Sequence, residues 1–153
     1  MTLRPIALTC GEPAGIGPDI IIQLAQSELL DELVCIGDAE LLEQRAALMG
    51  LPLRLLDESD SLTGMGQLRI RHQGLPQPNV SGEPSTKNAE AVLHTLDTAI
   101  DGCLDGTFRA MTTGPLHSHH QRGWYSLLRA HRVLGRENRC ANTGFLGQVL
   151  GVP

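Results

Sequence analysis

The chain has 153 residues, 41% of them hydrophobic, with a formal net charge of −5 at pH 7. This length predicts one core of moderate size and a single domain. The apolar runs are too short to span a bilayer and the N-terminus enters a strand pattern at once, so no membrane segment or signal peptide is expected, and the cytoplasm is the expected location. Four scattered cysteines without a C-x-x-C pair indicate small buried residues rather than a zinc site or disulfides.

The charge is divided unevenly along the chain. Residues 1–117 hold 7 Lys and Arg against 16 Asp and Glu, whereas residues 118–153 hold 5 Arg against one Glu. The second segment also contains the only Trp, the only Tyr and three of the six His. Such a step is typical of a basic nucleic-acid-binding appendage, and it is equally typical of sequence that was never selected together with the rest.

Short apolar runs alternate with amphipathic segments along residues 1–117. The runs that predict strands, in chain order, are residues 5–9, 33–37, 53–56, 67–71 and 108–113. Three helices are predicted: the first opens with Pro18 at its first position, the second follows Asp38 as an N-cap, and the third runs from Ser85. The last two end at Gly50 and Gly106. Residues 72–85, with three prolines and two glycines, predict an irregular connection. The alternation predicts an α/β fold with a substantially parallel sheet flanked by helices.

Two loops follow predicted strands, and ligands bind at the carboxyl ends of the strands in such sheets. The first is CGEPAGIGPDI, residues 10–20, whose glycines allow close backbone approach and whose helix start can receive an anion; a tight strand-to-helix turn is the alternative. The glycine spacing does not match the dinucleotide fingerprint. The second loop is TTGPLH, residues 112–117, in which His117 is either a ligand or acid–base group or simply solvated. Asp38 is interpreted as a helix cap rather than a ribose ligand.

These two loops carry a family resemblance. The segments GEPAGIGPD, IGD, SGEPSTKNAEAVLHTLDTAIDGCLDG and AMTTGPLH occur in the order and approximate spacing of the 4-hydroxythreonine-4-phosphate dehydrogenase family of pyridoxal phosphate biosynthesis. The resemblance covers residues 5–117. GEPAGIGPD also resembles the N-terminal loop of isocitrate and isopropylmalate dehydrogenases, so their fold is implied as well, in an incomplete form.

The resemblance implies a two-domain homodimer with its active site in a cleft. The implied reaction is NAD-dependent oxidation of a secondary alcohol on 4-phosphohydroxy-L-threonine, followed by β-decarboxylation assisted by a divalent metal cation. By resemblance, a loop near the nicotinamide is formed by Gly11, Glu12, Gly15 and Gly17, and the wall of the substrate cleft by Thr113, Gly114, Pro115 and His117. Glu12 either orients the cofactor or a water, or is a helix-start carboxylate favoured by the dipole. No catalytic base, metal ligand or phosphate-binding lysine is assigned within this chain.

The family pattern stops after His117, where the family continues with a Lys and a Gly-His-Thr-Glu-Phe motif. When residues 119–144 are back-translated and read one base later, one permitted reading is IINEAGIPFSGHTEFLAERTGAQTP, which resembles that continuation. We therefore expect residues from about 118 onward to be an out-of-frame tail without a domain of its own, ended by a spurious stop. Residues 1–117 are expected to be the N-terminal part of the dehydrogenase fold, and the chain itself to be inactive.

Several alternatives stay open from the sequence. The histidines at 117, 119 and 120 have a spacing that suits a metal, and the Arg-rich tail has a composition that suits a nucleic acid, although the acidic body would repel phosphates. A dehydrogenase of a phosphorylated sugar acid such as erythronate or threonate 4-phosphate would share the pattern. A phosphate acyltransferase of similar fold would use coenzyme A without NAD, and a pure binding protein would show neither activity.

Overall fold

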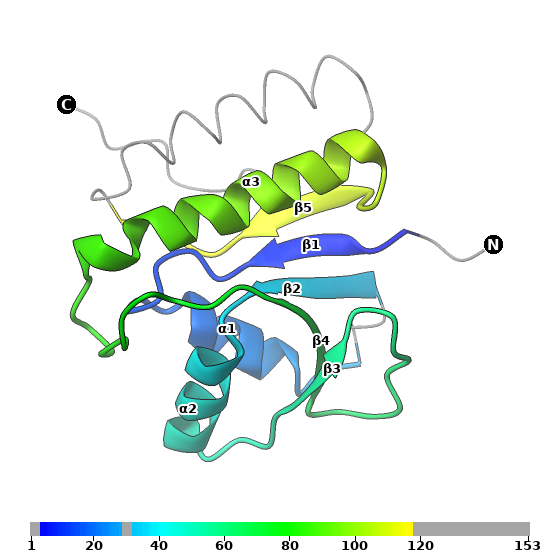
Figure 1. The fold of residues 1–153 in the computed structure, drawn as a ribbon. Helices are drawn as coiled ribbons and strands as arrows, with labels where there is room; N and C mark the ends of the chain where they lie inside the picture. Colours follow the sequence, from blue (N-terminus) through cyan, green and yellow to red (C-terminus); the bar gives the residue numbers. More distant parts are fainter. Residues whose placement is uncertain (1–3, 29–31, 118–153) are drawn as a thin grey trace.

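The computed structural model describes residues 4–28 and 32–117. Five parallel strands form one sheet in the order β3-β4-β2-β1-β5 (Figure 1). The strands are β1 (Ile6–Thr9), β2 (Leu33–Gly37), β3 (Arg54–Asp57), β4 (Gln67–His72) and β5 (Ala110–Thr113). The helices are α1 (Gly17–Leu24), α2 (Ala39–Met49) and α3 (Ala89–Asp105), preceded by the 3-10 turn η2 (Thr86–Asn88). The predicted parallel α/β fold is confirmed.

The predictions for the tail, including the shifted reading frame, the basic patch and the histidine cluster beyond position 117, lie outside the described residues. Within them, no helix combines the length and the hydrophobicity that crossing a membrane requires. The cysteines at 10, 35 and 103 are buried free thiols, as the sequence predicts for small buried residues.

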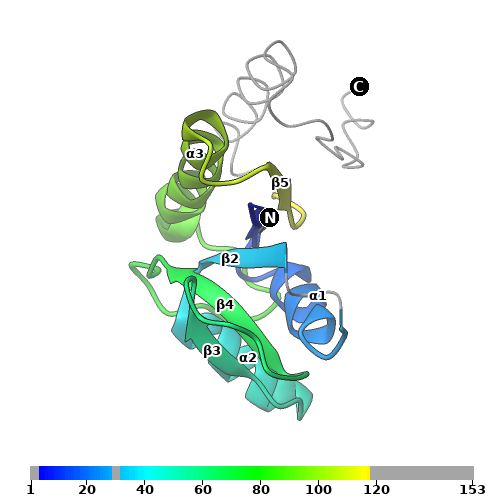
Figure 2. The same ribbon diagram turned by 90° about the vertical axis from the view of Figure 1, so that its right-hand side faces the viewer.

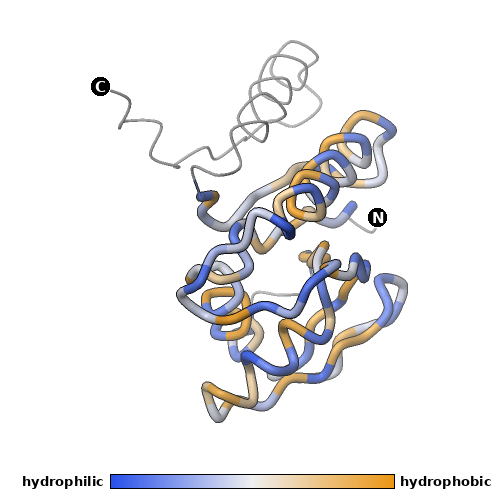
Figure 3. Tube along the Cα trace, turned by 60° about the vertical axis from the view of Figure 1, so that its left-hand side comes forward, coloured by the Kyte–Doolittle hydropathy of each residue, from blue (hydrophilic) through white to orange (hydrophobic). Residues whose placement is uncertain are grey.

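The sheet separates two layers of helices, and the alternation of side chains along each strand divides the core accordingly. On one face, α3 packs on Ala7 of β1 and on Val34 and Ile36 of β2. On the other face, α1 and α2 pack on Leu8 of β1 and Cys35 of β2. Figure 2 shows the two layers on opposite sides of the strands, and Figure 3 shows hydrophobic and hydrophilic positions alternating along α3.

Local signals fix the ends of α2. The side chain of Asp38 accepts a hydrogen bond from the Leu41 N–H at 3.1 Å, which satisfies one of the donors left free at a helix start. At the other end, Gly50 adopts a left-handed conformation with φ of 66° and returns its N–H to the carbonyl groups of the last turn. Both predicted helix limits are confirmed.

The strand predicted over residues 108–113 begins two residues later than expected, at Ala110. Phe108 is only 1% exposed and packs in the α3 layer rather than extending the sheet. Its backbone N–H donates to the carbonyl of Gly102 at 2.8 Å, and its ring lies over that glycine. The absence of a side chain at Gly102 therefore lets the chain turn from α3 into β5.

Replacing Gly102 by Ala is expected to destabilise the fold by about 1 to 3 kcal/mol, because the core there is already filled. The new Cβ would lie 2.4 Å from Cδ2 of Phe108. This outweighs the gain of about 1 kcal/mol in helix propensity. Urea unfolding would measure the change, with Asp101→Ala on the exposed side of α3 as a control that should shift the midpoint little. Equal stability of Gly102→Ala and the parent chain would contradict this packing.

Candidate functional site

The strand order first indicates the carboxyl ends of the neighbouring strands β2 and β4 as a possible ligand site. The helix after β2 lies on one face of the sheet and the helix after β4 on the other, which is where open parallel sheets bind ligands. Here the chain itself closes that position, since Gln73 N–H donates to the Gly37 carbonyl at 2.8 Å and Leu75 N–H to Asp38 Oδ2 at 2.6 Å. A cavity of about 20 Å³ remains beneath these bonds and holds about one water. A larger, open pocket of about 220 Å³ lies beside it, between α2 and the segment after β4, and is lined by Asp38, Gln44 and Asn79 among others.

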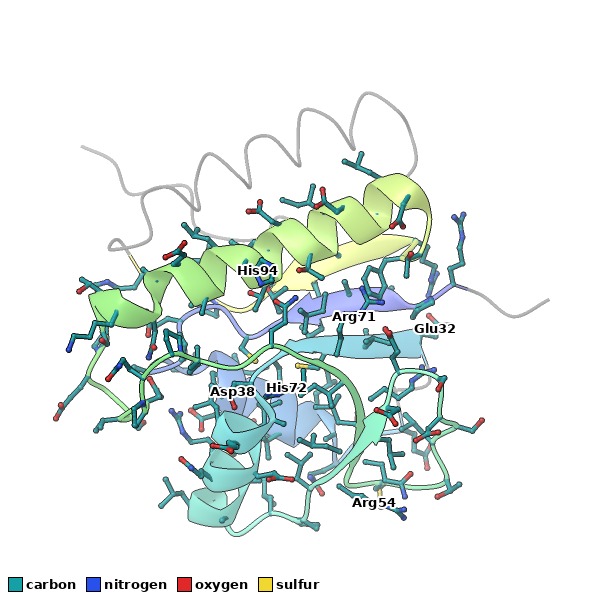
Figure 4. All side chains as sticks on the ribbon, viewed as in Figure 1. Glu32, Asp38, Arg54, Arg71, His72 and His94 are labelled. Carbon is teal, nitrogen blue, oxygen red and sulfur yellow. The ribbon has the colours of Figure 1, made fainter. Side chains whose placement is uncertain are left out.

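Asp38 lies at this closed position, at the start of α2 (Figure 4). One of its oxygens accepts from Leu41 N–H and the other from Leu75 N–H. Nearby, His72 Nδ1 accepts from the Ala39 N–H at 3.1 Å, which adds a second acceptor at the start of the helix. Both side chains accept hydrogen bonds from backbone N–H groups, so the interpretation of Asp38 as a helix cap is confirmed.

The two predicted loops meet at the carboxyl ends of the neighbouring strands β1 and β5. The Glu12 N–H donates to the Pro115 carbonyl at 2.8 Å, and the Gly114 N–H donates to the Thr9 carbonyl at 2.8 Å. The buried hydroxyl of Thr9 donates to the Thr113 hydroxyl at 2.8 Å, and Thr113 donates in turn to the Gly114 carbonyl. The structure thus brings together two segments that are about a hundred residues apart in sequence.

Three glycines make this meeting sterically feasible. Gly11 has a φ of 72°, and a Cβ there would lie 2.4 Å from the Pro115 carbonyl oxygen. A Cβ on Gly17 would lie 1.8 Å from the carbonyl oxygen of Cys10, and a Cβ on Gly114 would lie 2.3 Å from the same oxygen. Gly15 is less crowded, with 3.3 Å from its Cβ position to the Glu12 carbonyl oxygen. The close approach that the sequence suggests therefore occurs between the two loops.

Glu12 is the buried acidic group of this loop, with 6% of its surface exposed. Its Oε1 accepts from the Ala14 N–H at 3.0 Å, and its carbonyl accepts from the Gly15 N–H at 3.0 Å. Both contacts close a turn just before α1, where the helix dipole favours a carboxylate. On the facing loop, His117 is half-buried and follows Leu116, which packs against the α3 layer.

Arg45 is a residue of this site that the sequence analysis missed. It projects from α2, is 5% exposed, and forms an ion pair with Asp19 at 3.0 Å. Its guanidinium also donates to the Gly15 carbonyl at 3.2 Å and to the Pro13 carbonyl at 3.1 Å. One buried cation thus connects α2, the start of α1 and two carbonyls of the glycine-rich loop.

The irregular segment after β4 lies against the other side of the same loop. Asn79 Nδ2 donates to the Pro13 carbonyl at 2.9 Å, and the Gly82 N–H donates to the Ala14 carbonyl at 2.8 Å. Figure 1 shows this segment running from the end of β4 across the carboxyl ends of the strands towards α3. The glycine-rich loop is therefore held from three directions, by the β5 loop, by Arg45 and by this segment.

Cys10, at the base of the loop, contacts the thiol of Cys35 across the sheet with 4.0 Å between their sulfur atoms. The hydrogen bond with Cys10 and, next, burial raise the pKa of the Cys35 thiol well above its usual range.

In residues 4–28 and 32–117, no group of three His, Cys, Asp or Glu side chains gathers in a way that would hold a metal ion. The site thus consists of two loops joined by backbone hydrogen bonds, with Glu12 as the buried carboxylate of the first loop.

A family model and two curated relatives match this chain, and they indicate one family. A family model described as "Pyridoxal phosphate biosynthetic protein PdxA" matches residues 28–126. A 4-hydroxythreonine-4-phosphate dehydrogenase of Citrobacter koseri is 47% identical over 120 residues, covering 76% of this chain and 36% of the relative. One of Enterobacter sp. strain 638 is 46% identical over 121 residues, covering 76% and 37%. The chain therefore spans little more than a third of the length of these curated relatives.

A solved structure shows the same fold. The crystal structure of 4-hydroxythreonine-4-phosphate dehydrogenase from Klebsiella pneumoniae superimposes with a TM-score of 0.72 at 27% sequence identity. The match covers 86% of this chain and 44% of that one.

Arg45→Met is expected to lower the free energy of unfolding by about 2 kcal/mol, because the hydrogen bonds from a buried charged group to two carbonyls are lost and the partly exposed Asp19 loses its partner. The Pro13 and Gly15 carbonyls would lose the donors that Arg45 supplies. Arg54→Met on the exposed strand β3 is the matched control and should change stability by less than about 0.5 kcal/mol. Equal effects of the two substitutions in urea unfolding would show that Arg45 does not brace the loop.

The raised pKa of Cys35 predicts a loss of stability in alkaline solution. The folded chain holds this proton more tightly than the unfolded chain, so the contribution is complete below the unfolded pKa of about 8.5. It is lost as the pH rises through the folded pKa. The free energy of unfolding, measured between about pH 8 and pH 10, should fall less steeply in Cys35→Ala than in the parent chain. Cys10→Ala, which removes the first cause of the shift, should flatten the profile too, and parallel profiles would contradict the assignment.

Proposed function

Since the chain belongs to the pyridoxal phosphate biosynthetic protein PdxA family, whose named relatives are dehydrogenases, we propose that it represents the first part of an NAD-dependent 4-phosphohydroxy-L-threonine dehydrogenase. The observation that supports this most is the junction of the β1 and β5 loops through the hydrogen bond from Glu12 to Pro115. It creates one continuous wall at the carboxyl edge of the sheet, where this class of fold binds its substrates. The chain by itself is proposed to be inactive.

Each loop has its own part in this proposal. The nicotinamide side is formed by Gly11, Glu12, Gly15 and Gly17, and the substrate side by Thr113, Gly114, Pro115 and His117. Glu12 keeps the first loop in shape through its bond to the Ala14 N–H and presents a carboxylate beside the start of α1. His117 supplies an imidazole to the second loop, and Thr113 holds the carbonyl of Gly114 in place. These residues orient ligands and limit access of water rather than react themselves.

NAD, when bound, accepts the hydride that leaves the alcohol carbon. Among the described residues, the first loop would border NAD by its shape, because its N–H groups at Glu12, Ala14 and Gly15 already donate to Pro115 and Glu12. Both oxygens of Asp38 are likewise engaged by backbone N–H groups. The described residues do not fit a metal, since no group of three metal-ligating side chains occurs among residues 4–28 and 32–117. No step of this proposal therefore runs through a metal ion.

We also propose that the sequence after position 117 is read out of frame. The support is the shifted reading that restores a Gly-His-Thr-Glu-Phe motif over residues 119–144. Resequencing the coding DNA across the codons for residues 116–121 tests this directly. A difference of one or two bases that restores the motif is expected, and a confirmed reading frame would reject the proposal.

The activity is tested with two proteins. The 153-residue chain, supplied with 4-phosphohydroxy-L-threonine, NAD and a divalent cation, is expected to form no NADH. A chain in which residues 1–117 continue into the frame-corrected sequence is expected to form it, and Gly114→Ala in that chain should reduce the rate because the loops are forced apart. Erythronate 4-phosphate serves as the competing substrate. NADH formation by the short chain, or a folded long chain that is active only on the sugar acid, would overturn the proposal.

A further inference from the structure

Two buried thiols lie together at the base of the glycine-rich loop. Cys10 directly follows β1, and its sulfur lies 4.0 Å from the sulfur of Cys35 in the neighbouring strand β2. The two residues are 25 positions apart in sequence, so the fold brings them together. Both are free thiols in the structure. Cys103, another buried free thiol, belongs to the core layer under α3 on the other face of the sheet.

A glycine in β2 lets the two sulfur atoms meet. Positions 35 and 37 of this strand are on the same face of the sheet, because successive residues of a strand alternate between its faces. A Cβ on Gly37 would lie only 3.0 Å from the sulfur of Cys10. The side chain of Cys10 therefore uses the space that a side chain at position 37 would fill, and it reaches along this face towards Cys35.

The distance between the sulfur atoms is close to what a covalent bond requires. A disulfide needs about 2.05 Å between them, so they have to close from 4.0 Å to that length. Thr9 is the last residue of β1 that is paired with β2, so the backbone of Cys10 lies outside the ladder of these strands. Rotation of both side chains and movement of Cys10 can close the distance without breaking a β1–β2 pair.

A small oxidant reaches this pair from the side of Cys10. The cavity of about 20 Å³ that holds about one water is lined by Cys10, Gly37 and Gln73 among others. Cys10 is 6% exposed, whereas Cys35 has no exposed surface. The hydrogen bond with Cys10 and, next, burial raise the pKa of Cys35, which therefore keeps its proton. Cys10 is thus the residue that is oxidised first, and Cys35 the residue that reacts with it afterwards.

We propose that Cys10 and Cys35 form a modification site at which hydrogen peroxide converts two thiols into a reversible disulfide. In the first step, the sulfur of Cys10 bonds to one peroxide oxygen, the O–O bond breaks, and the thiol proton leaves with the other oxygen as water. In the second step, the sulfur of Cys35 displaces the new hydroxyl group, which leaves as water with the Cys35 proton. The two thiols lose two electrons and two protons, and the peroxide becomes two waters.

Peptide mapping of the 153-residue chain tests this proposal. The reduced, folded chain is treated with hydrogen peroxide, its remaining thiols are alkylated under denaturing conditions, and it is cut after glutamate. Cuts after Glu28 and Glu32 separate Cys10 from Cys35 unless a disulfide joins them. The peptide pair joined through these two cysteines should exceed any pair joined through Cys103 roughly tenfold, because its sulfur atoms are already in contact. Dithiothreitol should release the two peptides.

Three variants separate the roles of the two thiols. In Cys35→Ala, peroxide should leave Cys10 as a sulfenic acid that dimedone labels, because no thiol lies beside it to react further. In Cys10→Ala, dimedone should label Cys35 several-fold less, because that residue has no exposed surface. Cys103→Ala is the matched control, since it removes a buried cysteine from the other face of the sheet and should leave the Cys10–Cys35 link unchanged.

Each of three results would overturn the proposal. Oxidation of Cys10 in the folded chain without the joined peptides would show that the sulfur atoms do not close to bonding distance. An unmodified Cys10, under peroxide that fully oxidises the same chain in urea, would show that the cavity gives no access. Equal yields of the joined peptides from the folded and the unfolded chain would show that the fold does not favour this pair. The readout requires no dehydrogenase activity, so its failure is distinct from failure of the proposed function.

Discussion

The carbonyl group of Cys10 is the point on which the carboxyl edge of the sheet depends. Gly17 and Gly114 approach it so closely that a side chain on either would overlap with the Cys10 oxygen. A backbone approach of this kind forces the start of α1 and the end of β5 against the same atom. The Glu12 to Pro115 hydrogen bond then fixes the two loops relative to each other. A side chain at Gly114 would force the β5 loop away from the first loop, whereas a side chain at Gly17 would distort the first loop itself.

Sequence reasoning succeeds where the signal is local. The limits of α2 follow from Asp38 and Gly50, which act on backbone groups within a few residues of themselves. The position of the two loops also follows, because parallel strands direct their carboxyl ends to one edge. The start of β5 is different: Phe108 is diverted into the core by the space above Gly102, six residues earlier in α3, so strand propensity alone misplaces the boundary.

The parts of the site that the sequence does not reveal depend on long-range contacts. Arg45 is 30 positions away from Gly15, and its place in α2 gives no sign that it reaches the glycine-rich loop. Asn79 reaches the same loop from 66 positions away, out of a segment whose prolines and glycines predict only irregular structure. The glycine spacing predicts close approach but not its partner, which is another loop. Only the packing of α2 and of the irregular segment against the loop identifies these residues.

The hydrogen bonds of Asp38 at the carboxyl ends of β2 and β4 bear on how a cofactor could be recognised. In dinucleotide-binding folds an acidic residue after the second strand binds the ribose, but here both oxygens of Asp38 hold backbone N–H groups, and releasing them would uncap α2. Under the proposed function, recognition of NAD therefore relies on groups other than the Asp38 carboxylate. The two loops themselves are joined by the hydrogen bond from Glu12 to Pro115, so any group that the first loop orients is placed relative to the β5 loop as well.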